Sequence, residues 1–162
     1  MTKNLSPKIE QIMNEIIMDC PNAIFGGSIA LLAAGLIDRK ISDIDLIFSE
    51  NNYNNNEFKN IFLKKNYDVF QTSSPWSDTD NVFDGRKIVR QGISVNGVKI
   101  CCFVIPDDLL KFSTKPFLDR KIKVHDLEYI IKTKIEFMHK NTKHKVDLDQ
   151  IIRNLVRVWN EY

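Results

Sequence analysis

Two aspartates and a glycine–serine turn are the residues of this chain best suited to chemistry. Gly26-Gly27-Ser28 opens an apolar, alanine- and leucine-rich segment, and Asp43 and Asp45 follow with one apolar residue between them. Residues i and i+2 of a strand point to the same face, so the two carboxylates would lie side by side while Ile44 points to the core. Carboxylate oxygens are ligands that Mg²⁺ prefers. Two such ions, about 3.5–4 Å apart, activate a nucleophile and neutralise a leaving pyrophosphate.

The glycine–serine turn is suited to a phosphate group. Gly26 and Gly27 have no side chains, so the backbone can approach a ligand closely. Ser28 adds a hydroxyl at the start of a predicted helix, where free N–H groups and the helix dipole attract anions. A glycine pair alone is usually a turn, and two aspartates at this spacing alone are usually a solvated strand end. Their occurrence together, in this order and between apolar flanks, predicts a site for a nucleoside triphosphate and its metal ions.

In this arrangement, Gly26-Gly27-Ser28 and Asp43-Ile44-Asp45-Leu46 resemble the signature of the nucleotidyltransferase superfamily of the DNA polymerase beta type. The minimal and abortive-infection branches look closest, and the resemblance covers the first half of the chain best. It implies an α/β (α+β) fold in which a mixed sheet is flanked by helices and the core is followed by C-terminal helices. It also implies that the turn holds the triphosphate of an NTP, and that the two aspartates ligate two Mg²⁺ ions and act in catalysis.

Two basic residues complete the site that the resemblance implies. Arg39, just before the carboxylate strand, is similar to a basic residue that contacts phosphate or the acceptor. Lys134 interrupts an apolar helical stripe that includes Leu127 and Ile131, and an ammonium group buried without a partner is costly. Either the stem of Lys134 packs while its head reaches water, or it faces the cleft and meets a phosphate or a carboxylate. The resemblance favours the second alternative and makes Lys134 a catalytic residue.

Lys145 and Asp149 form a similar pair in the last predicted helix. Their i, i+4 spacing allows a structural ion pair on one helix face. The resemblance, which is looser here, offers the alternative that one of them lines the floor of the cleft.

The family's third carboxylate is expected on a strand within residues 98–106, and by register Cys101 stands in its place. A thiol is a soft ligand and a poor partner for Mg²⁺. No Asp or Glu occurs between Ile88 and Ile105. Three explanations remain open: catalysis has been lost while nucleotide binding is kept, the register differs, or a carboxylate from elsewhere completes the site. The loop candidates for that carboxylate are Asp80, Asp84 and Asp107.

Two functions are consistent with these residues. The first is a Mg²⁺-dependent nucleotidyltransferase that moves an NMP group from an NTP to a hydroxyl of RNA, protein or a small molecule. The alternative is a catalytically degenerate protein on the same scaffold that binds nucleotide or a partner as a regulator. Neither function requires DNA or a membrane, and we expect neither as a partner.

Periodicity and turn residues predict the elements that must position these groups. Helices are expected at 7–18, 28–36, 57–65, 126–140 and 145–159, and strands at 22–25, 43–48, 67–70, 88–95 and 98–105. Asn96-Gly97 between the last two strands is the strongest short hairpin signal. The asparagine-rich stretch 51–56, residues 71–87 and the region around Pro116 are expected to be a turn and two loops.

The composition fits one domain in a reducing compartment. The chain has 162 residues, 43% of them hydrophobic, and a net charge of +2, which does not by itself indicate nucleic acid binding. We expect a single nucleotidyltransferase-like domain over residues 1–162, with a core of about 1–112 and C-terminal helices over about 122–162. The three cysteines lack zinc spacing, and Cys101 and Cys102 would point to opposite faces of a strand. No signal peptide or membrane-spanning run is present, so we expect a cytoplasmic protein.

Overall fold

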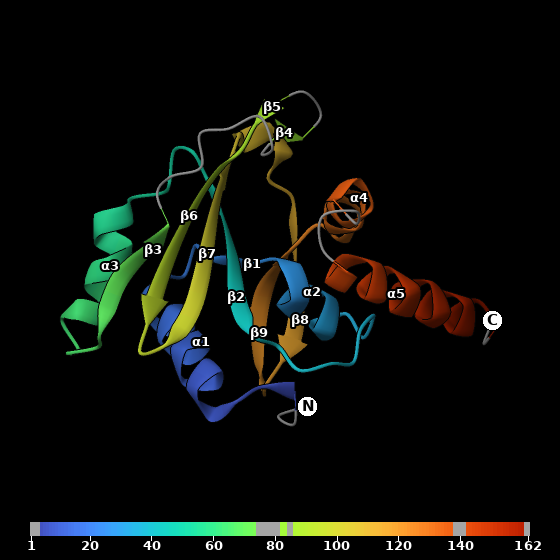
Figure 1. Ribbon diagram of the computed structural model, residues 1–162, viewed down its shortest axis with the longest axis horizontal. Helices are drawn as coiled ribbons and strands as arrows, with labels where there is room; N and C mark the ends of the chain where they lie inside the picture. Colours follow the sequence, from blue (N-terminus) through green and yellow to red (C-terminus); the bar gives the residue numbers. More distant parts are fainter. Residues whose placement is uncertain (1–3, 74–81, 84–85, 138–141, 161–162) are drawn as a thin grey trace.

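A seven-stranded mixed sheet organises the computed structural model of this chain, which describes residues 4–73, 82–83, 86–137 and 142–160 (Figure 1). From one edge to the other, the strands are β3 (Val69–Ser73), β6 (Val89–Val95), β7 (Val98–Ile105), β2 (Asp43–Ser49), β1 (Ile24–Phe25), β9 (Arg120–His125) and β8 (Phe112–Phe117). A separate two-stranded ribbon consists of β4 (Val82–Phe83) and β5 (Arg86–Lys87). The mixed sheet predicted from the sequence is confirmed.

Helices pack on the sheet, and two further helices come after the last strand in the chain. They are α1 (Pro7–Asp19), α2 (Gly27–Ala33), α3 (Asn55–Leu63), α4 (Leu127–Phe137) and α5 (Thr142–Asn160), with a short 3-10 helix at Asp107–Leu109. In Figure 1, α1 and α3 lie near β3, β6 and β7, whereas α4 and α5 lie beyond β1 and β2, and α5 extends toward the C-terminus. None of the described helices is long and apolar enough to cross a membrane.

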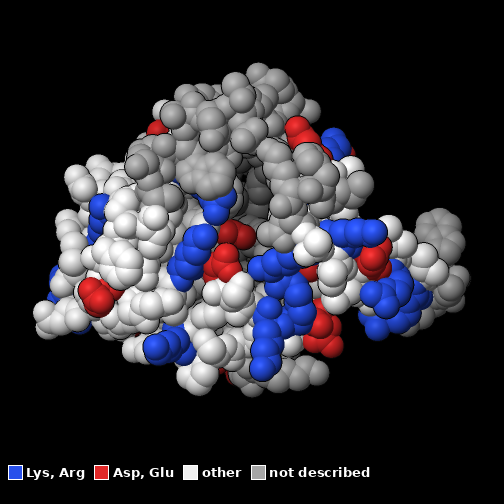
Figure 2. All heavy atoms as spheres, in the orientation of Figure 1, with Lys and Arg blue, Asp and Glu red and all other residues white. Residues whose placement is uncertain are grey.

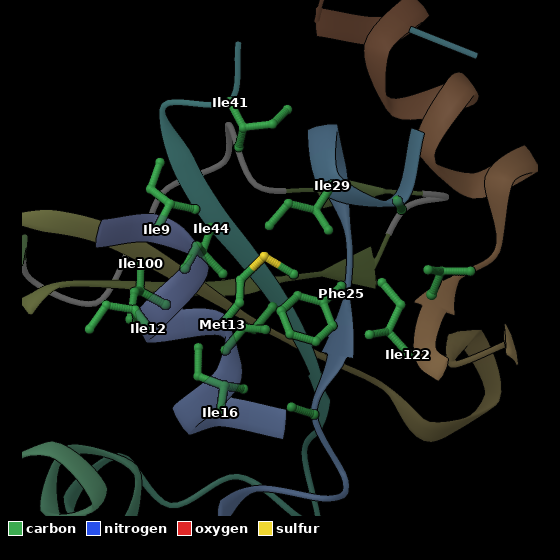
Figure 3. Packing of buried hydrophobic residues seen from close by; sticks show 14 of the residues in the cluster. Ile9, Ile12, Met13, Ile16, Phe25, Ile29, Ile41, Ile44, Ile100 and Ile122 are labelled. Carbon is green, nitrogen blue, oxygen red and sulfur yellow. The ribbon is translucent and has the colours of Figure 1, made fainter. Parts of the chain in front are cut away.

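The first helix shows how local sequence specifies packing. The Ser6 hydroxyl accepts a hydrogen bond from the backbone N–H of Ile9, and a proline occupies the first turn, as predicted. The buried side chains recur at helical spacing and form one face: Ile9, Ile12, Met13 and Ile16. Figure 3 shows this face directed at the apolar residues of the sheet.

Strand β2 separates the core from the candidate site. It pairs in parallel with β7 and antiparallel with β1. Ile44 and Leu46 are fully buried on the core side, where Figure 3 places Ile44 near Met13 and Ile100 near Ile12. Since side chains alternate along a strand, Asp43 and Asp45 point to the opposite face. The alternation predicted for this strand is therefore confirmed.

The hairpin predicted at Asn96-Gly97 is also confirmed. β6 and β7 pair antiparallel on either side of it, and the two turn residues have φ angles of +49° and +83°. Such left-handed conformations match the twist of the flanking strands, which explains why this dipeptide is a reliable signal.

The predicted loop around Pro116 is wrong, because β8 and β9 form a second hairpin there. It turns at Leu118 and Asp119, whose φ angles are +51° and +60°. Pro116 lies on the edge strand β8, where a missing N–H does not interrupt the rest of the sheet. β9 pairs with β1, so the sheet continues to His125, and the first C-terminal helix begins at Leu127, within one residue of the predicted start at residue 126.

Two other loop boundaries also need correction. The asparagine-rich stretch already contains the start of α3, since the Asn54 side chain accepts a hydrogen bond from the N–H of Glu57 and caps the helix. The long loop expected over residues 71–87 begins later than predicted, because β3 runs to Ser73, and it includes the ribbon of β4 and β5. Its remaining residues lie outside the described part of the chain.

Candidate active site

The glycine turn and the carboxylate strand are in direct contact. β1 and β2 run antiparallel, and beyond their last paired residues the Gly26 N–H donates to the carbonyl of Asp45 at 2.9 Å. Gly27 then adopts φ +51° at the first position of α2, and a Cβ atom built there would lie 2.0 Å from Oδ2 of Asp45. Glycine is therefore required at position 27 both by backbone conformation and by the space that the carboxylate occupies.

The electrostatics of the two aspartates favour a bound cation. Burial raises the pKa of Asp45, the charge of Asp43 raises it further, and nearby basic groups offset only part of the effect. The side chain of Asp43 is 31% exposed, accepts a hydrogen bond from Ser42 and lies 4.0 Å from Nζ of Lys143. Like charges held this close destabilise each other unless a cation lies between them. The hard oxygen donors of this pair fit Mg²⁺.

Cys101 lies directly opposite Asp45 on the neighbouring strand. The parallel pairing of β2 with β7 places Asp45 directly opposite Cys101, so both side chains project from the same face of the sheet. Burial raises the pKa of the Cys101 thiol, so it stays protonated at neutral pH. Among the described residues, no three His, Cys, Asp or Glu side chains form a metal-binding group. Asp43 and Asp45 remain two carboxylates on one face of β2.

Arg90, which was not predicted from the sequence as a site residue, also lies next to Cys101. Arg90 of β6 is paired with Phe103 of β7, two residues beyond Cys101 on the same face. Its Nη2 donates to Sγ of Cys101 at 3.4 Å, and its guanidinium lies over the Phe103 ring, 5.6 Å from the centroid. The positive charge of Arg90 also partly offsets the upward shift in the pKa of Asp45.

A buried carboxylate joins the other predicted residues into one network. Asp147 of α5 is fully buried and accepts two hydrogen bonds from Arg39, at 2.6 and 2.8 Å, and one from Lys134 at 2.8 Å. Arg39 Nη2 also donates to the Ser28 hydroxyl at 2.6 Å. Lys134 Nζ is 3.5 Å from Nδ1 of His144. The loop before β2 is in this way tied to α2, α4 and α5.

The positive charges of Arg39 and Lys134 keep the Asp147 carboxyl group deprotonated. Burial alone raises the pKa of Asp147, but the hydrogen bonds from Arg39 and Lys134 outweigh it and hold the pKa below the usual carboxyl value. Lys134 is only 6% exposed and its ammonium group donates to Asp147, so the alternative in which its head reaches water is wrong. Two cations held by one carboxylate leave a net positive charge next to Ser28.

Asp147 itself was missed, although its sequence contains a signal. It interrupts the apolar face that Leu148 and Ile151 form on α5, as Lys134 interrupts the apolar face of α4. Opposite charges that interrupt two apolar helix faces predict that the faces pack together. The looser resemblance had instead indicated Lys145 and Asp149, and both of these are exposed.

Within the described part of the chain, no loop carboxylate proposed to complete the site lies next to Cys101. Asp107 lies beyond the end of β7, is exposed, and accepts a hydrogen bond from Asn51. The strand from Cys101 to Ile105 alone spans about 13 Å, so Asp107 is remote from Asp45. The other two candidates, Asp80 and Asp84, lie outside the described residues.

The surface view gives the charge distribution around this site. Figure 2 shows acidic side chains at the centre of one face, beside a hollow, with basic side chains on either side of them. An arrangement of this kind suits a ligand that carries both phosphate groups and a metal ion, because each charge then meets its opposite.

No family model and no curated protein matches this sequence. Solved structures do match the fold. ANT(2")-Ia in complex with adenylyl-2"-tobramycin has a TM-score of 0.64 at 15% identity, over 90% of this chain and 88% of that chain. An antigenic nucleotidyltransferase-like protein from Paracoccidioides brasiliensis has a TM-score of 0.55 at 18% identity, over 91% and 76% of the two chains. The fold is therefore that of the nucleotidyltransferases, as the resemblance of the turn and the aspartates implied.

Proposed function

We propose that this protein is a nucleotidyltransferase that moves an NMP group from an NTP to a hydroxyl acceptor with the help of Mg²⁺. The observation that carries the proposal is the contact between Gly27 and Asp45. A turn that tolerates no side chain lies against one of two same-face carboxylates, within a fold shared with nucleotidyltransferases. A protein that used this fold only as a scaffold would have no need of such a costly pair of charges.

The acidic and basic residues around the turn would have different roles, in metal binding and in phosphate binding. Asp43 and Asp45 would hold the metal, which supplies positive charge to the phosphates and to the developing negative charge on the leaving group. Arg39 and Lys134, fixed by Asp147, would attract the triphosphate from the side of Ser28. Because these cations are already held in place, little reorganisation would be needed when the nucleotide binds.

A small hydroxyl compound is the first acceptor class to test. The solved complex of ANT(2")-Ia contains tobramycin with an adenylyl group at its 2" position, and that chain matches this one over most of its length. We therefore propose ATP as the first donor, with RNA and protein as the other acceptor classes. We also propose that the chain acts as one domain over residues 1–162 and, since its three cysteines are free thiols, that it acts in the cytoplasm.

Substitution of the aspartates tests the proposal. Asp43→Asn and Asp45→Asn should each lower transfer of label from α-³²P-ATP by about two orders of magnitude or more, because the charge that holds the metal is lost. Exposed Asp68, whose side chain lies outside this network, provides the matched control Asp68→Asn. Full activity in both site variants would refute the mechanism. Circular dichroism would verify that each variant is folded.

A catalytically degenerate nucleotide-binding regulator is the second candidate function. The presence of Cys101 opposite Asp45 favours it. Calorimetric titration of ATP with and without Mg²⁺ distinguishes the two: a regulator binds the nucleotide in a metal-dependent way but transfers no label to any acceptor. If Cys101→Asp then gained transfer activity, the missing carboxylate would be the cause.

A further inference from the structure

The last helix, α5, has an apolar surface that the rest of the chain leaves exposed. Its residues Ile152, Leu155 and Val156 are 58%, 49% and 54% exposed. Their i, i+3, i+4 spacing places them on one side of the helix, and we call these three side chains the α5 stripe. In Figure 1, this second half of α5 extends away from the sheet toward the C-terminus. Single exposed apolar side chains are common, whereas a contiguous exposed group is typical of an interaction surface.

The α5 stripe is separate from the face by which α5 packs on the molecule. That packed face contains the buried residues Asp147, Leu148 and Ile151. Beside them, the Asn154 amide donates to the carbonyl of Leu36 at 2.7 Å and ties the helix to the segment after α2. α5 therefore has apolar side chains on two sides, which is typical of a helix that is covered on both.

Charged residues beside the α5 stripe are arranged about one point. Asp149 lies four residues before Arg153, and Arg157 lies four residues after it, so the three exposed side chains form one row along the helix. Arg153 Nε donates to the backbone carbonyl of Asp149 at 3.3 Å, which holds this side chain along its own helix. Neither Asp149 nor Arg157 forms an ion pair with another residue in the described part of the chain. A row with an acid at one end and a base at the other is complementary to the same row in the reverse direction.

We propose that the α5 stripe binds a second copy of this chain, with the two α5 helices antiparallel across a two-fold axis near Arg153. In this arrangement Asp149 of each copy faces Arg157 of the other, and the two stripes pack together beside these ion pairs. A parallel arrangement would place like charges opposite each other. The symmetry of the charges favours a second copy over an unrelated partner, which would not require it. The inference does not rest on the proposed function, because the α5 stripe contains none of the candidate site residues.

Sedimentation velocity of the full chain tests the inference. A contact of one helix from each copy belongs to the small interfaces, below about 1,200 Å², that are typical of weak and reversible complexes. The sedimentation coefficient should therefore rise from that of a monomer to that of a dimer between about 1 and about 200 μM. Leu155→Glu places a charge in the apolar contact and should remain monomeric throughout this range. Met18 on α1 is also apolar and 69% exposed, so Met18→Glu is the matched control and should dimerise like the wild type.

Charge reversal tests the antiparallel direction. Asp149→Arg and Arg157→Glu should each weaken dimerisation about tenfold, because like charges then meet at both ends of the contact. The double variant with both substitutions makes each pair opposite again and should regain the wild-type affinity. Circular dichroism would verify that the variants keep their helix content.

Each outcome supports or overturns a part of the inference. A wild type that stays monomeric up to about 200 μM would overturn it and leave the α5 stripe to a partner of another kind. Dimerisation of Leu155→Glu with wild-type affinity would place the contact on another surface, and a double charge variant without recovery would exclude the antiparallel arrangement. If Leu155→Glu does not fold, the charge variants still decide. These measurements use neither nucleotide nor metal, so their outcomes leave the proposed function untouched.

Discussion

Gly27 and Asp45 show how much of this site depends on single atoms. The missing side chain at position 27 allows a carboxylate oxygen to lie where a Cβ atom would otherwise be. Asp45 in turn stays in an environment that opposes its charge, since burial and Asp43 both raise its pKa. Local stability is given up here in favour of a binding site.

A glycine comparison isolates this effect. Gly27→Ala and Gly35→Ala both introduce a side chain at a positive φ angle, +51° and +73°, and this backbone strain should cost each about 1 kcal/mol of unfolding free energy, or about 2–4 °C in Tm, with a further loss in Gly27→Ala from the clash with Asp45. Only Gly27→Ala also forces Asp45 to move, because nothing lies within 4 Å of a Cβ atom at Gly35. It alone should lose metal-dependent ATP binding, measured by calorimetry. Equal binding in the two variants would show that the close contact has no functional consequence.

The elements differ in how well the sequence predicts them. β2 and the β6–β7 hairpin were predictable because their signals are local: alternating apolar residues and an Asn-Gly turn. The β8–β9 hairpin was missed because Pro116 suggests a loop, and only pairing with β1 makes its position an edge strand. Its turn at Leu118 and Asp119 has left-handed backbone without a glycine, which no turn signal identifies.

The residues of the site also differ in how well the sequence predicts them. The turn and the two aspartates were found because each motif is contiguous in the sequence. Asp147 and Arg90 were not found, because their roles arise from contacts between distant segments: Arg39 and Asp147 are 108 residues apart. A resemblance in the first half of the chain carries no information about such contacts.

Asp147 connects two elements, and its removal should be costly. Asp147→Ala leaves the buried Lys134 and the largely buried Arg39 without their carboxylate, which should lower the unfolding free energy by about 3 kcal/mol or more. Asp149→Ala, two residues along the same helix and exposed, should change it by no more than about 0.5 kcal/mol. Urea denaturation measures both. If the two variants were equally stable, the network would not join the C-terminal helices to the rest of the molecule.

At the scale of the whole molecule, the site depends on segments from the entire chain. The turn and the aspartates come from the first third of the chain, Arg90 and Cys101 from its middle third, and Lys134 and Asp147 from the last two helices. A site assembled in this way exists only when the chain has folded completely. Conditions that weaken the packing of the C-terminal helices α4 and α5 against the sheet should therefore also weaken the site.

Low pH should have this effect, because the buried His125 lies where β9 leads into α4. It ends β9 immediately before α4, is 1% exposed, and packs against the ring of Tyr129 with centroids 4.5 Å apart. Burial lowers its pKa to about 4, below the ordinary value of 6.5. Above pH 6.5 the full stability is present, and it is lost as the pH falls toward 4, since the unfolded chain then takes up a proton that the folded chain does not. The loss should approach 3 kcal/mol, an order-of-magnitude figure.

His125→Phe tests this origin of acid sensitivity. The variant keeps an aromatic ring beside Tyr129 but cannot be protonated, so the unfolding free energy, measured in urea at pH values from 7 to 4.5, should decline less than in the wild type. His144, whose pKa is also lowered by burial and by Lys134, contributes in the same direction, and His144→Gln measures its share. Asp147 acts only at lower pH, because its pKa lies below 3.8. An unchanged slope in His125→Phe would mean that the joint between β9 and α4 does not control the response to acid.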